Sequence, residues 1–439
     1  MSLMPAHDGH ESWAGARPTA RSSVSLLVHL ALPVVLLCPL VLEFYWPAAG
    51  GLDVTGHQIG RDFINVWAGP QLAFGGQLAT LFDLHAYHAA IGVLFGQPLP
   101  FHNWGYPPFT LLAFWPLAQL PYFAALAVWT LGLFAIFAGV TLSQVERPRR
   151  AGALLALILA PACLINTIGG QNGFLSATLM LGGTLAIDRR PILAGLLFGL
   201  LSFKPHLGIA LPFVLLALRA WRVIATACVT ALLLVLLSLA VFGIEPWRQY
   251  IEVVGAYQVS LLQRFRGFYT FMMVSGVAGA RTFGLTYPVA LVLQVALAVP
   301  VLGAAIWAMR STTDPCQRAF VLASAAPLVT PYVFNYDLTA LAAALVWTLC
   351  RTPQHEFGRG LLLFLGWMTP IRGLVLFLGW IVPVLAMYLN EIGLGLAPLA
   401  LAAVFALSVY DAISVRSEGS AAIFLSKFHP HSRTSADDQ

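Results

Sequence analysis

Charged residues are scarce in this 439-residue sequence. Asp, Glu, Lys and Arg make up only 9% of the chain, whereas hydrophobic residues make up 59%. Soluble domains carry charge on about a quarter of their residues, because polar surface must cover the apolar core. The composition therefore excludes a soluble globular protein, and lipid must be the solvent for most of the chain. In hydrocarbon every backbone N–H and C=O group needs an internal partner, so the apolar runs must be helices.

Other absences narrow the chemistry. The chain has five cysteines, none in the two long polar loops and none at metal-ligand spacing, so we expect neither disulfides nor a cysteine-bound metal. The sequence has no Walker A motif, no Gly-rich loop after a strand and no soluble segment long enough for a nucleotide-binding fold. An enzyme without such a fold cannot easily bind a nucleotide-activated sugar. Any activated sugar that it used as a donor would have to reach it through the membrane.

The basic residues lie in short clusters between the apolar runs, so the net charge of +5 indicates topology rather than nucleic-acid binding. The positive-inside rule places these clusters in the cytoplasm. They are Arg147/Arg149/Arg150, Arg189/Arg190, Arg219/Arg222, Arg310/Arg318 and Arg351/Arg359. By alternation, the loops 47–106 and 244–285 are expected on the outer face, with the segments around Gln171, Lys204 and Asp337.

The apolar runs predict an all-α polytopic membrane protein, a bundle of about 11 to 13 transmembrane helices. Residues 24–412 would form this bundle, between a cytoplasmic tail at 1–23 and a polar tail at 413–439. The first span, 24–46, lacks a convincing cleavage site, so we expect a retained helix rather than a signal peptide. Later spans are expected near 151–167, 172–187, 191–203, 206–219, 223–243, 286–309, 319–333 and 337–350, with two or three more between 360 and 412.

The segment before the second span requires a separate interpretation. The chain must cross an odd number of times between the outer loop and Arg147, yet residues 107–143 contain two apolar runs. Only 121–143 is long enough to span at about 1.5 Å per residue. Residues 107–120 are therefore expected to form a re-entrant or juxtamembrane helix that completes a first periplasmic loop at 47–120.

Asp62 is the leading catalytic candidate. It follows the first span, in the sequence Gly60-Arg61-Asp62-Phe63. One interpretation is that its carboxylate caps a helix over 63–74, because an N-cap Asp accepts hydrogen bonds from the first free N–H groups. The other is that Asp62 is a general base at the membrane–water boundary.

Cations lie on the same predicted face. Lys204 is one of only two lysines and ends a span, in the sequence Phe203-Lys204-Pro205-His206. It either snorkels to the interface or binds an anionic headgroup. Arg264 and Arg266 lie in the second outer loop, where both could converge on a phosphate. A solvated or lipid-headgroup contact is equally compatible with their positions.

Two acidic positions complete the candidates. Asp337 follows a helix break at the outer boundary, where an ionisable residue is a functional candidate, although it could equally cap the helix that begins at Leu338. Asp83, His85 and His88 form a short cluster that could bind a metal. No further ligands follow at a recognisable spacing, so we favour ordinary loop residues there and expect no metal and no cofactor.

Taken in order, these segments resemble glycosyltransferase family 87, membrane enzymes of the GT-C fold that include polyprenol-phosphate-mannose-dependent mannosyltransferases. The matching residues are Asp62-Phe63 with Trp67-Ala68-Gly69, Tyr106-Pro107-Pro108, Pro116-Leu117, Gly170-Gln171-Asn172, and Ala194-Gly195 through Lys204-Pro205. The resemblance covers about residues 24–350, most of the chain. It implies a GT-C-like bundle in the bacterial inner membrane, with an active site that faces the periplasm.

The resemblance also implies a reaction. A mannose-like sugar would pass from a polyprenyl-phosphate donor to a lipid or glycan acceptor, in a metal-independent, inverting transfer with Asp62 as base. The residues expected to bind the substrates are Lys204, Arg264, Arg266, Asp337, His206, Gln171, Asn172 and Tyr106. Where mannosyltransferase members carry a histidine-bearing motif, this chain has Phe334-Asn335-Tyr336-Asp337, which leaves the sugar and the acceptor open. Membrane lipids, but no nucleic acid, are expected as partners.

Other functions fit parts of this pattern. A secondary transporter would use Asp62, Lys204 and Asp337 as coupling groups, but such groups tend to lie near the bilayer midplane between internal repeats, and no repeat is visible. A lipid-binding protein would leave the polar outer loop unexplained, and another lipid-linked polymer enzyme, such as a ligase, would use similar groups. If the protein is a glycosyltransferase, we expect Asp62, Lys204 and the Arg264 region to converge around one cavity that opens to lipid.

Overall fold

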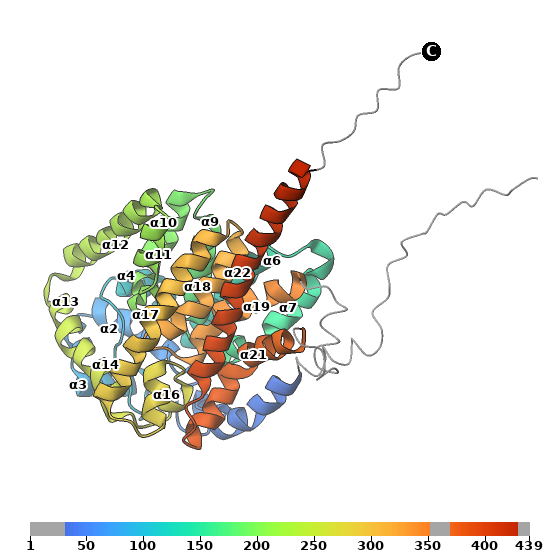
Figure 1. The fold of residues 1–439 in the computed structure, drawn as a ribbon. Coiled ribbons are helices and arrows are strands. Elements are labelled where there is room, and N and C mark those ends of the chain that lie inside the picture. The colour runs from blue at the N-terminus through green and yellow to red at the C-terminus, as the bar shows by residue number, and fades with distance from the viewer. Residues whose placement is uncertain (1–30, 352–368, 429–439) are drawn as a thin grey trace, which may run out of the picture.

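The computed structural model describes residues 31–351 and 369–428. Within these ranges the chain is helical, with isolated bridges but no β-strand, which confirms the all-α class predicted from composition. Figure 1 shows one bundle from which the end of α22 (Ala397–Phe428) projects. α22 continues past residue 412 into the expected polar tail. The tail at 1–23, the beginning of the first span and Arg359 lie outside the described residues.

Five helices in these ranges are long and apolar enough to cross a membrane. They are Tyr122–Leu142, Trp221–Phe242, Tyr287–Ser311, Ile371–Glu391 and Ala397–Ser414. The bent pair Arg147–Leu159 and Pro161–Ile168, which meet at 55°, forms a sixth if counted as one span. The protein is therefore a multi-pass membrane protein, and the described residues include five or six of its expected spans at full length. Other expected spans are short helices, among them Gly173–Ala186, which has no exposed residue, and Pro191–Phe203, which has an exposed apolar face.

The segment before the second span folds as predicted. α4 (Thr110–Ala118) is a separate helix, and the chain then turns into the continuous run formed by α5 (Tyr122–Ala127), η4 (Val128–Gly132) and α6 (Leu133–Leu142). α4 packs against α2 (Phe63–Phe74). Buried side chains of both helices, with those of α3 (Leu84–Phe95), form a small hydrophobic core under the first loop.

Three helices form the centre of the bundle: α9 (Gly173–Ala186), α18 (Pro315–Val329) and α19 (Thr339–Arg351). Most of their side chains are buried. α12 (Trp221–Phe242), by contrast, has only Val223, Thr230 and Ser238 buried, as expected for a helix that faces lipid. It packs on α10 (Pro191–Leu200) through small residues: a Cβ on Gly199 would lie 2.5 Å from Thr230 Cβ.

Shorter elements and the remaining long helices complete the chain. They are η1 (Val41–Tyr45), η2 (Ala49–Gly51), η3 (Leu78–Phe82), η5 (Arg147–Arg149), α7 (Arg150–Leu159), α8 (Pro161–Ile168), η6 (Leu201–Phe203), η7 (Pro205–Gly208), α11 (Leu211–Ala217), α13 (Glu245–Gln249), η8 (Tyr250–Val254), α14 (Gly255–Arg264), α15 (Tyr269–Met272), α16 (Gly276–Thr282), α17 (Tyr287–Ser311), η9 (Asn335–Leu338) and α21 (Thr369–Glu391). Many of the shorter elements surround the functional candidates.

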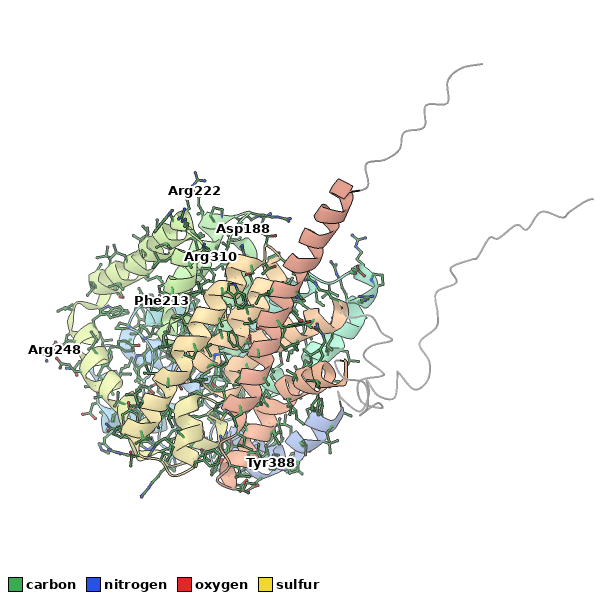
Figure 2. The ribbon with its side chains drawn as sticks, viewed as in Figure 1. Asp188, Phe213, Arg222, Arg248, Arg310 and Tyr388 are labelled. Atoms are coloured by element: carbon green, nitrogen blue, oxygen red, sulfur yellow. The ribbon has the colours of Figure 1, made fainter. Side chains whose placement is uncertain are left out.

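Described members of the clusters predicted to be cytoplasmic lie at one end of the bundle, which we call the basic end. There Arg318 pairs with Asp188 at 2.8 Å and Arg351 with Asp314 at 2.5 Å. Figure 2 shows Arg222, Arg310 and Asp188 near one end of the molecule and Tyr388 at the other. The 14 residues of α9, about 21 Å of helix, separate Asn172 from the basic end. The functional candidates therefore lie at the opposite end of the helices that carry the basic clusters.

Candidate active site

Asp62 occupies the N-cap position of α2, but its side chain makes no capping hydrogen bond. Its Oδ2 instead accepts a hydrogen bond from Nε2 of Gln171. Asp83, in the same loop, behaves in the opposite way: its Oδ1 accepts from the backbone N–H groups of His85 and Ala86 at 3.0 and 2.9 Å and caps α3. The capping interpretation therefore describes Asp83, whereas the carboxylate of Asp62 faces another segment.

Two glycines allow the Asp62 and Gln171 segments to meet. Gly60 and Gly170 both have positive φ, +90° and +58°. A Cβ on Gly170 would lie only 2.4 Å from the backbone oxygen of Gly60, so no larger residue fits at this crossing. Trp129 Nε1 donates to the backbone oxygens of Gly170 and Gln171, both at 3.2 Å. These bonds fix the backbone of the segment that carries Gln171.

Lys204 is buried rather than snorkelling to the interface. Its Nζ donates to Oδ1 of Asp337 and, at 2.9 Å, to Oδ1 of Asn172. The ring of Tyr336 lies 4.7 Å from the same ammonium group and adds a cation–π contact. Asn172 in turn donates to Tyr106 Oη at 3.0 Å. Asp337, Lys204, Asn172 and Tyr106 therefore form one hydrogen-bonded network. It connects η9 with the loop after α10 and the loop before α9.

Asp337 accepts its backbone hydrogen bond from a residue before it in the chain, so it does not cap the helix that begins at Leu338. Oδ1 accepts from Lys204, while Oδ2 accepts from the backbone N–H of Phe334 at 3.1 Å, within the turn that leads into α19. The carboxylate compensates the buried lysine charge, which would otherwise be costly in this environment. Asp337 is therefore a local turn residue and the counter-ion of Lys204.

These loops surround a cavity of about 820 Å³, which we call the polar cavity. Six of the predicted site residues line it: Asp62, Tyr106, Gln171, Asn172, Lys204 and His206. Phe101 and Ile251 also line it and are 47% and 69% exposed, so part of its rim is apolar. Asp62 and Lys204 thus converge as predicted.

Arg264 and Arg266 do not line the polar cavity. Both side chains are exposed, Arg264 at the last position of α14 and Arg266 just beyond it. Leu261, one turn earlier in α14, and Tyr269 do line the cavity, so the arginines lie at its margin. Their expected contact with a phosphate stays a prediction.

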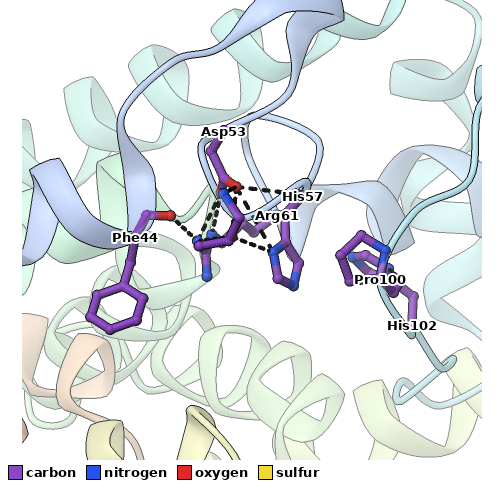
Figure 3. Close-up of polar contacts among 7 residues, drawn as sticks. Phe44, Asp53, His57, Arg61, Pro100 and His102 are labelled. Atoms are coloured by element: carbon purple, nitrogen blue, oxygen red, sulfur yellow. Dashed lines mark hydrogen bonds and ion pairs between the residues drawn. The ribbon is translucent and has the colours of Figure 1, made fainter.

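Sequence reasoning missed a second polar cluster on the cavity wall (Figure 3). Arg61 donates through Nε to Oδ2 of Asp53 at 2.9 Å and through Nη2 to Oγ1 of Thr55 at 3.0 Å. Its Nη2 also donates to the backbone oxygen of Phe44, at the end of the first helix. The available signal was adjacency, because Arg61 directly precedes Asp62 in a chain that has few charges.

Two histidines belong to the same wall, with ring centroids 6.0 Å apart. Burial, with a smaller contribution from the charge of Arg61, lowers the pKa of His57 to about 4. Burial also lowers the pKa of His102. Both rings are therefore neutral near pH 7 and add no positive charge to this side of the cavity.

The fold and the site define a multi-pass, all-α membrane protein with a polar cavity of a size suited to a small-molecule or lipid-linked substrate. Residues 104–331 match the model of glycosyltransferase family 87, and the chain belongs to this family. The match confirms the resemblance seen in the sequence. It includes Tyr106, Gln171, Asn172 and Lys204, while Asp62 and Asp337 lie outside the matched range.

A curated relative is the polyprenol-phosphate-mannose-dependent alpha-(1-2)-phosphatidylinositol pentamannoside mannosyltransferase of Mycolicibacterium smegmatis. It is 28% identical over 218 residues, which cover 40% of this chain and 47% of the relative. The chain thus spans about half the length of the curated relative that it matches. No solved structure gives a significant match to the chain.

Proposed function

We propose that the protein is a membrane glycosyltransferase that moves a mannose-like sugar from a polyprenyl-phosphate donor to a lipid or glycan acceptor, with Asp62 as general base. The observation that carries this proposal is the state of Asp62. Its carboxylate lines the polar cavity, caps no helix and has no ion-pair partner within residues 31–351 and 369–428. A carboxylate beside a cavity that neither caps a helix nor pairs with a cation is available for proton transfer.

The reaction would proceed in one displacement. An acceptor hydroxyl attacks the anomeric carbon, the bond from that carbon to the phosphate oxygen breaks, and the configuration inverts. Asp62 takes the hydroxyl proton, while the polyprenyl phosphate leaves with the bonding electron pair. Gln171 donates to one carboxylate oxygen, which leaves the other oxygen for the acceptor. The transfer requires no metal in this proposal, as the family resemblance implies.

Lys204 would stabilise the leaving phosphate. It is the only ammonium group among the cavity-lining residues, and its surroundings orient it through Asn172, Asp337 and Tyr336. A fixed cation next to developing negative charge lowers the barrier without reorganisation during the reaction. Asp337 limits the net charge around Lys204, so the donor phosphate would share Lys204 with this carboxylate.

The membrane supplies the donor in this proposal. The exposed apolar rim at Phe101 and Ile251 suits the first isoprene units of a polyprenyl chain. We place the cavity on the periplasmic face of a bacterial inner membrane, because the basic end would then be cytoplasmic. Bringing donor and acceptor together at one interface removes much of the entropic cost of their encounter.

The test isolates Asp62. Asn keeps the shape of the side chain, so Asp62→Asn should unfold at nearly the wild-type temperature and bind donor normally. Transfer should fall by a factor on the order of 10² to 10⁴, the usual contribution of a positioned base. The assay uses purified protein in nanodiscs, labelled polyprenyl-phosphate mannose as donor and a native lipid extract as acceptor source.

Asp83→Asn is the matched control, since it makes the same chemical change in the same loop at a carboxylate that caps α3. Asn caps helices about as well as Asp, so this variant should keep wild-type transfer. Substantial transfer by Asp62→Asn would remove Asp62 from the proposed role.

A further inference from the structure

Arg61 has an unusual backbone conformation directly before Asp62. Its φ is +32°, in the left-handed region that a non-glycine residue rarely adopts. Such a conformation persists only where the surrounding contacts enforce it, and it is commonly found at functional sites. Arg61 and Asp62 are joined by one peptide bond. Contacts that fix the backbone of Arg61 therefore also fix the position from which the Asp62 side chain extends.

The contacts that enforce this conformation are made by the side chain of Arg61 (Figure 3). The guanidinium forms a buried ion pair with Asp53, with Nη2 2.8 Å from Oδ2 and side chains 10% and 2% exposed. It also lies 4.0 Å from the ring centroid of Tyr45 and bonds to the backbone of Phe44. One side chain therefore ties the end of the first helix to the turn that leads into α2.

Asp53 is itself immobilised. Its Oδ1 accepts from the backbone N–H groups of Thr55 and His57, at 2.9 and 3.1 Å, and from Thr55 Oγ1 at 2.7 Å. Oδ2 is left to receive the guanidinium of Arg61. Every oxygen of the carboxylate is thus used, and the Arg61 charge is compensated within the protein. This arrangement favours a role in geometry over direct binding of an anionic substrate.

We propose that the Asp53–Arg61 pair is a positioning device that fixes the backbone before Asp62 and aims its carboxylate into the polar cavity. Arg61 and Asp53 are positioning residues, not catalytic ones. The inference rests on the proposed role of Asp62 as base. A displacement of about 1 Å at a reacting group costs on the order of 10²-fold in rate, so loosening this turn reduces turnover without removing any substrate contact.

The test compares Arg61→Lys, Asp53→Asn and the double variant Asp53→Asn/Arg61→Lys. A lysine keeps the charge but cannot reach Asp53, Thr55 and Phe44 together. Each single variant should lower kcat about 10- to 100-fold, with KM for labelled polyprenyl-phosphate mannose within about twofold of wild type. The double variant should be no slower than the slower single variant, because both changes disrupt one interaction.

Arg248→Ala is the control: this arginine pairs with Glu245 at 3.2 Å on the surface, and both side chains are 60% exposed. It should keep the wild-type kcat. A higher donor KM with unchanged kcat in Arg61→Lys would make Arg61 a substrate-binding residue and overturn the inference. Wild-type kcat in both single variants would also overturn the inference. The proposed function would still stand in that case if Asp62→Asn is inactive. An active Asp62→Asn would remove the proposed function and this inference together.

Discussion

Lys204 and Asp337 form a buried ion pair although 133 residues separate them in the sequence. The lysine side chain is 8% exposed and the aspartate side chain is fully covered. The pair connects the loop after α10 with the turn before α19, two segments that enclose the polar cavity. It is therefore both a structural link and, in the proposed reaction, the phosphate site.

The structural role of the Lys204–Asp337 pair and its role in phosphate binding can be distinguished by removing one charge or both. Lys204→Met leaves a buried, unpaired carboxylate and should lower the free energy of unfolding by about 3 to 5 kcal/mol. Lys204→Met/Asp337→Asn removes both charges, keeps an oxygen for the N–H of Phe334 and should recover most of that loss. Donor binding should be absent in both variants, because the phosphate has lost its cation. Thermal unfolding and binding of labelled polyprenyl-phosphate mannose measure the two effects. Normal donor binding by the double variant would make Lys204 purely structural.

The crossing of the Gly60 and Gly170 segments makes a second prediction. Gly170→Ala places a methyl group 2.4 Å from the backbone oxygen of Gly60, so the segment that carries Gln171 must move away from Asp62. Transfer should drop at least about tenfold, and the free energy of unfolding by about 1 to 3 kcal/mol.

Gly76→Ala is the control for Gly170→Ala. Gly76 has φ +80° but no atom within 4 Å of a built Cβ, so the variant has the backbone strain without the clash. It should keep wild-type transfer rates. Equal loss of transfer in the two variants would show that strain alone is responsible, and that the crossing does not position Gln171.

The orientation is testable in whole cells. In a cysteine-free background, Arg248→Cys should react with an impermeant maleimide from outside, because α13 lies in the second loop and this side chain is 60% exposed. Arg149→Cys, at the basic end, should react only after the membrane is permeabilised. Labelling of position 149 in intact cells would reverse the orientation and move the cavity to the cytoplasmic face.

His57 predicts a pH dependence of stability. Its pKa is lowered from 6.5 to about 4 in the folded protein, so between these values the unfolded chain binds a proton that the folded chain does not. The contribution of His57 to stability is therefore full above about pH 6.5 and decreases as the pH falls toward 4. Thermal unfolding across this range should show a shallower decline in His57→Asn than in wild type. Parallel curves for the two proteins would contradict the predicted contribution.

The sequence by itself determined the class of protein and the position of many helices. Scarce charge and apolar run lengths are local properties, and the cost of an unsatisfied backbone group in lipid converts them directly into helices. The separate helix at Thr110–Ala118 and the span that begins at Tyr122 followed from run length together with the odd number of crossings that the Arg147 cluster requires. Within residues 31–351 and 369–428 five helices are long enough to cross a membrane, and other expected spans, such as α9, are shorter helices with no exposed residue.

The tertiary structure alone decided the partners of the charged residues. At an N-cap position a carboxylate can bond to its own helix or to a distant segment, and local sequence is compatible with both. Asp83 bonds to its own helix, whereas Asp62 bonds to Gln171 of a distant segment. Gly60 and Gly170 allow Gln171 to reach Asp62. Long-range pairs depend on how helices pack rather than on local propensity. For this reason the sequence could nominate Lys204 and Asp337 separately, but only the packing of α9, α18 and α19 joins them.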